Sequence, residues 1–171
     1  MSTPCESVYD VFFDLIEEDR DFFNYYEATD EESYMLALQR AKALLRDAAI
    51  RMQMECDAEI DFTDTYTEGE GRKQKEFFTA DLTPFEIDLL ANLMYEGYLK
   101  RDVSKLRAFQ HQYTPSGLQV FSPANDRKTF MAMYNTVVEE NKVKLDRYAR
   151  RDRTTGKQRS IDYTSYETEE S

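Results

Sequence analysis

The sequence has no tryptophan, one histidine, two cysteines and only five glycines in 171 residues. His111 is the only histidine, so a metal site built from several histidines is excluded within one chain. Cys5 and Cys56 lie far apart and neither belongs to a CxxC motif, so we expect free thiols rather than a structural disulfide. No glycine-rich phosphate loop is present, so nothing indicates a nucleotide site.

Long hydrophobic runs are also missing. No stretch of about 18 apolar residues occurs, so we expect no membrane span. The first residues, MSTPCESVYD, carry no basic region ahead of an apolar one, so we expect no secretory signal. A chain of this length is most simply one domain.

Acidic residues are abundant but unevenly distributed. Residues 1–70 hold 19 acidic and 5 basic residues, whereas residues 71–171 hold 15 and 17. Within residues 127–159 the balance reaches +6. This pattern fits an ordinary acidic protein with a basic end. It also fits a dipolar subunit, in which an acidic face of one copy meets a basic face of the next, as in a ring.

Four sequence patterns predict the start of a helix. Three follow the capping-box pattern, in which Ser or Thr precedes Glu by three residues. The fourth has a serine cap and a proline in the first turn, which suits the fixed φ angle of proline. These starts are Thr3–Glu6, Thr29–Glu32, Thr83–Glu86 and Ser122–Pro123.

Apolar residues recur at helical spacing after each start. In the third helix the apolar face is widened by Leu89 and Leu93, which predicts burial on more than one side. The stripes are Val8, Phe12, Leu15 and Ile16; Tyr34, Leu38, Ala41, Leu45, Ala48 and Met52; Ile87, Leu90, Ala91, Met94 and Tyr98; and Phe130, Tyr134, Val137, Val138, Leu145 and Tyr148.

Two stretches differ from this helical pattern. Residues 57–80 alternate loosely around Gly69 and Gly71, which predicts a β-hairpin or an ordered loop. Residues 110–121 contain a turn signal, and we expect a loop there. The predicted fold is therefore mainly α: a bundle of about four helices over residues 1–149 with a short hairpin, followed by an extended C-terminal arm, residues 150–171.

Candidate chemistry is sparse. A dyad of His111 and Cys56 would need two distant segments to meet, and a polar loop histidine is the simpler interpretation. Residues 57–68 mimic the spacing of a calcium loop, but Phe62 replaces the required glycine and Asp64 the usual apolar residue. We expect no enzyme, no cofactor and no metal site.

Two interpretations involve nucleic acid. The basic stretch 142–159 could contact phosphates, although the acidic first half would repel them. Alternatively, the chain could imitate DNA with spaced carboxylates and inhibit a DNA-binding protein, which suits a pI of 4.6.

The third helix resembles a known family. Leu82-Thr83, Glu86-Ile87 and the run Leu90 to Met94 are similar to the central helix of head–tail connector (adaptor) proteins of tailed bacteriophages. The order of elements is similar too, and the stretch Tyr148 to Arg153 resembles the family's tail. One departure is Tyr98, where a residue like tryptophan would be expected.

The resemblance implies a structural virion protein, made in the host cytoplasm and located in the neck between capsid and tail. It implies a ring of about 12 copies that contacts the portal protein and the next neck or tail protein. Such rings line the channel through which DNA passes without specific binding. We hypothesise that a net acidic lining lets DNA slide, because it neutralises no phosphate.

The arm is the predicted interface with partners. We expect Arg150, Arg151 and Arg153 to pair with acidic groups on a neighbour, and Tyr163 and Tyr166 to anchor. Deleting residues 150–171 is expected to spare folding and abolish assembly.

Overall fold

The computed structural model describes residues 2–16, 29–56, 58–69, 74–112 and 123–159. Residues 102, 104–112 and 123–127 are described by their backbone alone. Over these ranges the chain is mainly helical with one small antiparallel sheet, as predicted. The elements are α1 (Glu6–Leu15), α3 (Asp30–Glu55), β1 (Thr65–Glu68), β2 (Lys75–Phe78), α4 (Pro84–Gln112) and α5 (Pro123–Ala149).

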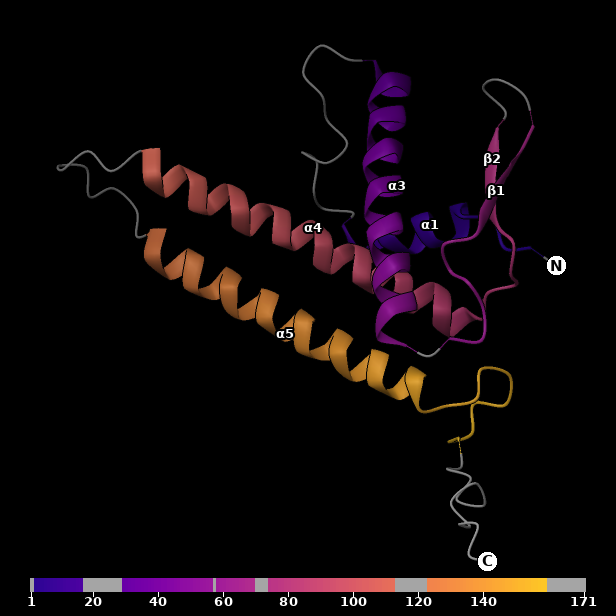
Figure 1. Cartoon of the computed structure of the whole chain (residues 1–171). Helices are drawn as coiled ribbons and strands as arrows, with labels where there is room; N and C mark the ends of the chain where they lie inside the picture. Colours follow the sequence, from indigo (N-terminus) through magenta and orange to yellow (C-terminus); the bar gives the residue numbers. More distant parts are fainter. Residues whose placement is uncertain (1, 17–28, 57, 70–73, 113–122, 160–171) are drawn as a thin grey trace, which may run out of the picture.

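The central element is α4, which packs against α1, α3 and α5. Figure 1 shows α4 and α5 running side by side in opposite directions, while α3 crosses them steeply and the hairpin stands beside α3. Leu89 and Leu90 are fully buried and Leu93 is nearly so, which confirms that α4 is covered on more than one side. Residues 89–94 of α4 therefore contribute to the core that these helices share.

Two of the predicted helix caps are confirmed. Thr29 accepts from the amide of Glu32, whose carboxylate accepts in return from the amide of Thr29. Thr83 and Glu86 make the same reciprocal pair at the start of α4. For α5, the helix begins at Pro123 as predicted, whereas Ser122 lies outside the described residues.

The predicted cap at Thr3 is wrong. Residues 2–5 lie alongside β2, with Pro4 bridged to Phe77 and the amide of Phe78 donating to the carbonyl of Thr3. The Thr3 hydroxyl accepts from the amide of Leu82 instead of capping α1. Because these backbone groups hydrogen-bond to the edge of the sheet, α1 begins only at Glu6, and no side chain caps its first turn.

The hairpin agrees with the sequence in its second strand, Lys75–Phe78, and its first strand is Thr65–Glu68. Thr65 pairs with Phe78 and Glu68 with Lys75. Residues 110–112, expected to belong to a loop, are part of α4, which continues to Gln112 and includes His111. Residues 113–122 lie outside the described residues.

The described side chains form one core. Phe12, Met52, Phe62 and Phe78 are almost completely buried, so α1, α3, the loop after α3 and the hairpin all contribute to it. Tyr34, predicted on the buried face of α3, is 53% exposed. None of the described helices has the length and apolar character needed to cross a bilayer.

Candidate functional site

The described part of the C-terminal arm, residues 150–159, is a compact turn rather than an extended strand. The Asp152 carboxylate accepts from the amides of Thr154 and Thr155 and from the Thr155 hydroxyl, at 3.1, 2.6 and 2.7 Å. These bonds lower the pKa of Asp152, the Thr155 hydroxyl contributing most. Gly156 has a φ of 65°, a conformation that suits glycine and lets the chain reverse.

The turn is closed by backbone pairing and docked onto the body. Arg151 bridges to Gln158, and the amide of Arg159 donates to the carbonyl of Arg150 at 2.9 Å. The Arg159 guanidinium lies 3.0 Å from the carboxylate of Glu59, in the loop after α3. We call residues 150–159 the anchored turn.

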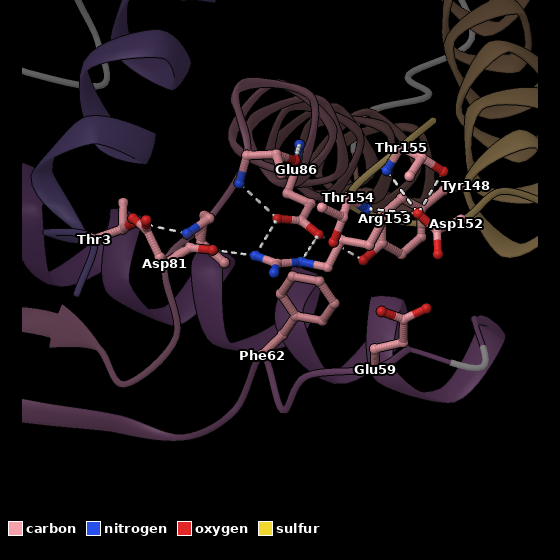
Figure 2. A network of polar contacts seen from close by, with 12 residues as sticks. Thr3, Glu59, Phe62, Asp81, Glu86, Tyr148, Asp152, Arg153, Thr154 and Thr155 are labelled. Atoms are coloured by element: carbon pink, nitrogen blue, oxygen red, sulfur yellow. Dashed lines mark hydrogen bonds and ion pairs between the residues drawn. The ribbon is translucent and has the colours of Figure 1, made fainter. Parts of the chain in front are cut away.

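Arg153 attaches this turn to α4 through a buried carboxylate. Its Nε donates to Glu86 Oε1 at 2.6 Å and its Nη2 to Glu86 Oε2 at 3.1 Å, a two-pronged ion pair. Nη2 also donates to the carbonyl of Asp81. Figure 2 shows the guanidinium of Arg153 between the Glu86 carboxylate and Asp81. The Glu86 side chain is completely buried and that of Arg153 is 18% exposed.

Glu86 has two further donors. The Tyr148 hydroxyl donates to Oε1 and the Thr83 amide to Oε2, both at 2.7 Å. Burial by itself would raise the pKa of Glu86, but the bonds from Arg153, Tyr148 and Thr83 outweigh it, so the pKa lies below its ordinary value. Glu86 is therefore charged and fully paired at neutral pH.

Aromatic rings hold Tyr148 in place. Its ring stacks on Phe85, with centroids 6.2 Å apart, and meets Phe62 edge-on at the same distance. Burial, and then the bond to Glu86, raise the pKa of Tyr148, so its hydroxyl remains a donor. The end of α5, the start of α4 and the loop after α3 thus converge on one carboxylate.

The predicted interface residues fall into three groups. Arg150 is 72% exposed and pairs with Asp146 one turn earlier, and Arg151 is exposed. Arg153 points inward, and its acidic partner is Glu86 of the same chain rather than a group on a neighbour. Tyr163 and Tyr166 lie outside the described residues. Because Arg153 belongs to the body, a deletion meant to spare folding should begin after Arg159.

A second polar cluster ties three helices together. Glu96 on α4 accepts from Arg51 on α3 at 2.6 Å and from Asn141 on α5 at 2.9 Å. Asn141, 1% exposed, also donates to the carbonyl of Asn92. Sequence reasoning missed both clusters. Two features of the sequence could have indicated them. Glu96 is a lone carboxylate inside an apolar run, and Glu86 was interpreted only as part of a helix cap.

Both clusters consist of charged and polar side chains that pair with groups of the same chain. Among the described residues no three Asp, Glu, His or Cys side chains gather as a metal site. Cys5 and Cys56 are buried free thiols whose pKa values burial raises to about 12 and about 11. At neutral pH both are protonated and poorly nucleophilic.

One hollow opens between α3 and the hairpin. It has a volume of about 610 Å³. Its floor is apolar, with Leu45, Phe62 and Phe78, and Lys42 and Arg46 line it from α3. It contains neither of the polar clusters described above.

Comparisons of this chain with protein-family models, with curated proteins and with solved structures gave no match.

Proposed function

We propose that this chain is a structural subunit of a bacteriophage neck, a head–tail connector that forms a ring between portal and tail and surrounds the DNA channel. The observation that carries the proposal is a contact. The two stretches that resemble connector proteins, Leu82–Met94 and Tyr148–Arg153, meet at Glu86, although they are about 60 residues apart in sequence.

This contact has a mechanical consequence for an assembly subunit. The anchored turn fixes the point at which the chain leaves the body, since Arg153 binds Glu86 and Arg159 binds Glu59. Arg159 therefore occupies a defined position on the surface. A terminal segment that starts from a fixed point loses less orientational freedom when it binds a portal or a neighbouring neck protein.

The charge pairs bear on the alternative of a DNA mimic. Several carboxylates of the acidic half are engaged by cations of the same chain, which reduces their resemblance to free phosphates. These pairs are Glu6–Lys75, Glu55–Arg51 and Glu59–Arg159.

Electron microscopy of the purified chain mixed with candidate phage portal rings tests the proposal. The expected result is added ring-shaped density on one end of the portal. The proposal fails if no portal ring binds the chain and the chain instead binds a DNA-binding protein from which duplex DNA displaces it.

A further inference from the structure

Residues 2–5 cover one edge of the small sheet. The amide of Phe78 donates to the carbonyl of Thr3 at 2.8 Å, and the amide of Cys5 donates to the carbonyl of Glu76 at 2.9 Å. The backbone groups of Glu76 and Phe78 that make these bonds are therefore turned away from β1.

β1 forms the other edge of the sheet, and that edge is open. Since backbone groups alternate in direction along a strand, Tyr66 and Glu68 are the residues of β1 that face β2. The amides and carbonyls of Thr65 and Thr67 face away from it. Within the described part of the chain, no donor or acceptor pairs with these four groups, and all of Thr65–Glu68 is exposed.

An open strand edge is a template for another strand, which binds it through backbone hydrogen bonds. A strand added to β1 would place every second side chain on the face of the sheet that borders the hollow, because Thr65, Glu76 and Phe78 line that hollow. The remaining side chains would lie on the opposite face, beside the stacked rings of Tyr66 and Phe77.

The α3 wall of the hollow changes from apolar to basic along the helix. Ile50 lines it nearest the C-terminal end of α3, Arg46 lies one turn earlier and Lys42 another turn earlier, about 12 Å from Ile50. Lys42 pairs with Glu76 at 3.2 Å. The Arg46 side chain makes no ion pair or hydrogen bond with any residue that the structure describes. The hollow therefore offers an apolar end and, beyond it, a cation that no described residue neutralises.

Residues 160–171 carry a sequence pattern that matches both faces. They contain four acidic residues and no basic residue. In an extended segment Tyr163 and Glu167 lie on one side, about 13 Å apart, and Tyr166 lies on the other side. The separation of Tyr163 from Glu167 is close to the length of α3 between the apolar and the basic end of the hollow.

We propose that residues 163–167 pair with β1 of their own chain as a parallel strand. Tyr163 lies beside Thr65 with its ring in the hollow, and the Glu167 carboxylate pairs with Arg46. This inference goes beyond the proposed function, because it concerns the chain on its own, before any partner binds. It supplies the open edge with backbone partners, so the free chain is protected against pairing with a foreign strand.

The opposite face of the added strand fits as well. Tyr66 stacks on Phe77 there, with ring centroids 5.5 Å apart. Tyr166 lies two residues beyond the position that is level with Tyr66, a diagonal that an aromatic side chain can span. Its ring extends the row that Phe77 and Tyr66 begin.

The point at which residue 160 follows the anchored turn favours an occupant from the same chain. Arg159 pairs with Glu59 at 3.0 Å. Glu59 lies six residues before Thr65, at most about 20 Å away, and a turn in which the Asp61 carboxylate accepts from the Thr63 amide shortens this distance. Residues 160–163 span about 13 Å when extended. A tethered segment also reaches β1 at a far higher effective concentration than a segment of a second copy.

The same tether accounts for the parallel direction. β1 leads away from the loop that contains Glu59, and residues 160–167 lead away from Arg159, which that glutamate binds. Running in the same direction, the segment brings its tyrosine to Ile50 before its glutamate comes level with Arg46. In the antiparallel direction the glutamate would come first and would enter the apolar end of the hollow, where a carboxylate is costly.

Cysteine cross-linking within the full chain tests the pairing. Ser165→Cys is combined with Thr67→Cys, because these positions are level in the proposed strand pair and both tyrosines remain. Neighbouring strands lie about 4.8 Å apart, within the range of Cα distances that a disulfide bridges. The native thiols are buried. After oxidation in dilute solution we expect a monomer that migrates faster on a non-reducing gel, with the two positions joined in one chain by mass spectrometry.

Matched variants show whether the cross-link reports the proposed geometry. Ser165→Cys combined with Glu68→Cys places the second thiol one residue further along β1, also exposed but on the opposite face, and should give a several-fold lower yield. Adding Tyr163→Ala to the first pair should lower its yield several-fold. Adding Arg46→Glu should do the same, and Glu167→Arg should then restore the yield.

Hydrogen exchange followed by NMR gives a second measurement without introduced cysteines. The amides of Thr65 and Thr67 should exchange several-fold faster when residues 160–171 are deleted, while the amide of Phe78, which donates to Thr3, should not change. Unchanged exchange at Thr65 and Thr67 would overturn the proposal. So would equal cross-linking to Glu68→Cys, a disulfide that forms only between two chains, or no disulfide with Thr67→Cys.

Discussion

Replacing Arg153 by methionine should destabilise the folded chain far more than its place near the C-terminus suggests. The substitution leaves the carboxylate of Glu86, which is completely buried, without the guanidinium that neutralises it. Breaking a buried ion pair by removing one partner costs about 3–5 kcal/mol. We expect about 3 kcal/mol, the lower end, because Arg153 is 18% exposed and Glu86 keeps its bonds from Tyr148 and Thr83.

Urea denaturation followed by circular dichroism measures this cost. For a chain of this size, about 3 kcal/mol corresponds to a fall in Tm of roughly 6–12 °C. Arg150→Met is the matched control, because it removes an arginine three residues away that is 72% exposed. We expect the control to cost no more than about 0.5 kcal/mol.

A double variant checks the reason for the cost. Glu86→Gln combined with Arg153→Met removes both charges, so it should be more stable than Arg153→Met alone. If Arg153→Met and Arg150→Met have the same small effect, the anchored turn does not hold onto α4 and our account of the site is refuted.

Three further predictions concern other parts of the molecule. The pKa of Glu86 is held below its ordinary value of 4.5, so its contribution to stability is present above pH 4.5 and is lost as the pH falls through the folded-state pKa. Urea titrations should therefore show the gap between wild type and Glu86→Gln narrowing below pH 4.5, and a constant gap would contradict this. Cys5 and Cys56 should resist iodoacetamide at pH 8 in the folded state and react once unfolded; mass spectrometry showing rapid native labelling would refute their burial. Asn141→Ala should cost about 1–3 kcal/mol because Glu96 and the Asn92 carbonyl lose a buried donor, whereas exposed Asn135→Ala should be nearly neutral; equal effects in urea would count against the cluster.

Local signals predicted most of the secondary structure. The capping boxes at Thr29 and Thr83 depend on hydrogen bonds between residues only three positions apart, so the local sequence is enough to identify them. The same pattern at Thr3 failed because β2, more than 70 residues away, competes for that backbone. A tertiary contact of this kind leaves no mark in the local sequence.

The candidate site was only half visible for the same reason. Arg153 and Glu86 each stood out, one as a surface cation and the other as a cap, but their pairing depends on how α5 packs against α4. The sequence of this basic stretch does not distinguish Arg153 from the neighbouring arginines. Its inward direction could therefore not be predicted. The spacing of apolar residues identifies which face of a helix is buried. Which element packs against that face depends on the whole fold.

The central proposal, that the chain forms a ring at one end of a phage portal, is tested most directly by the mass of the complex it forms. Mass photometry of a phage portal ring with excess chain should show a single heavier species. Its added mass should equal about a dozen copies of the 20.2 kDa chain. Binding of one or two copies to every portal ring tested, or of none, would contradict the claim.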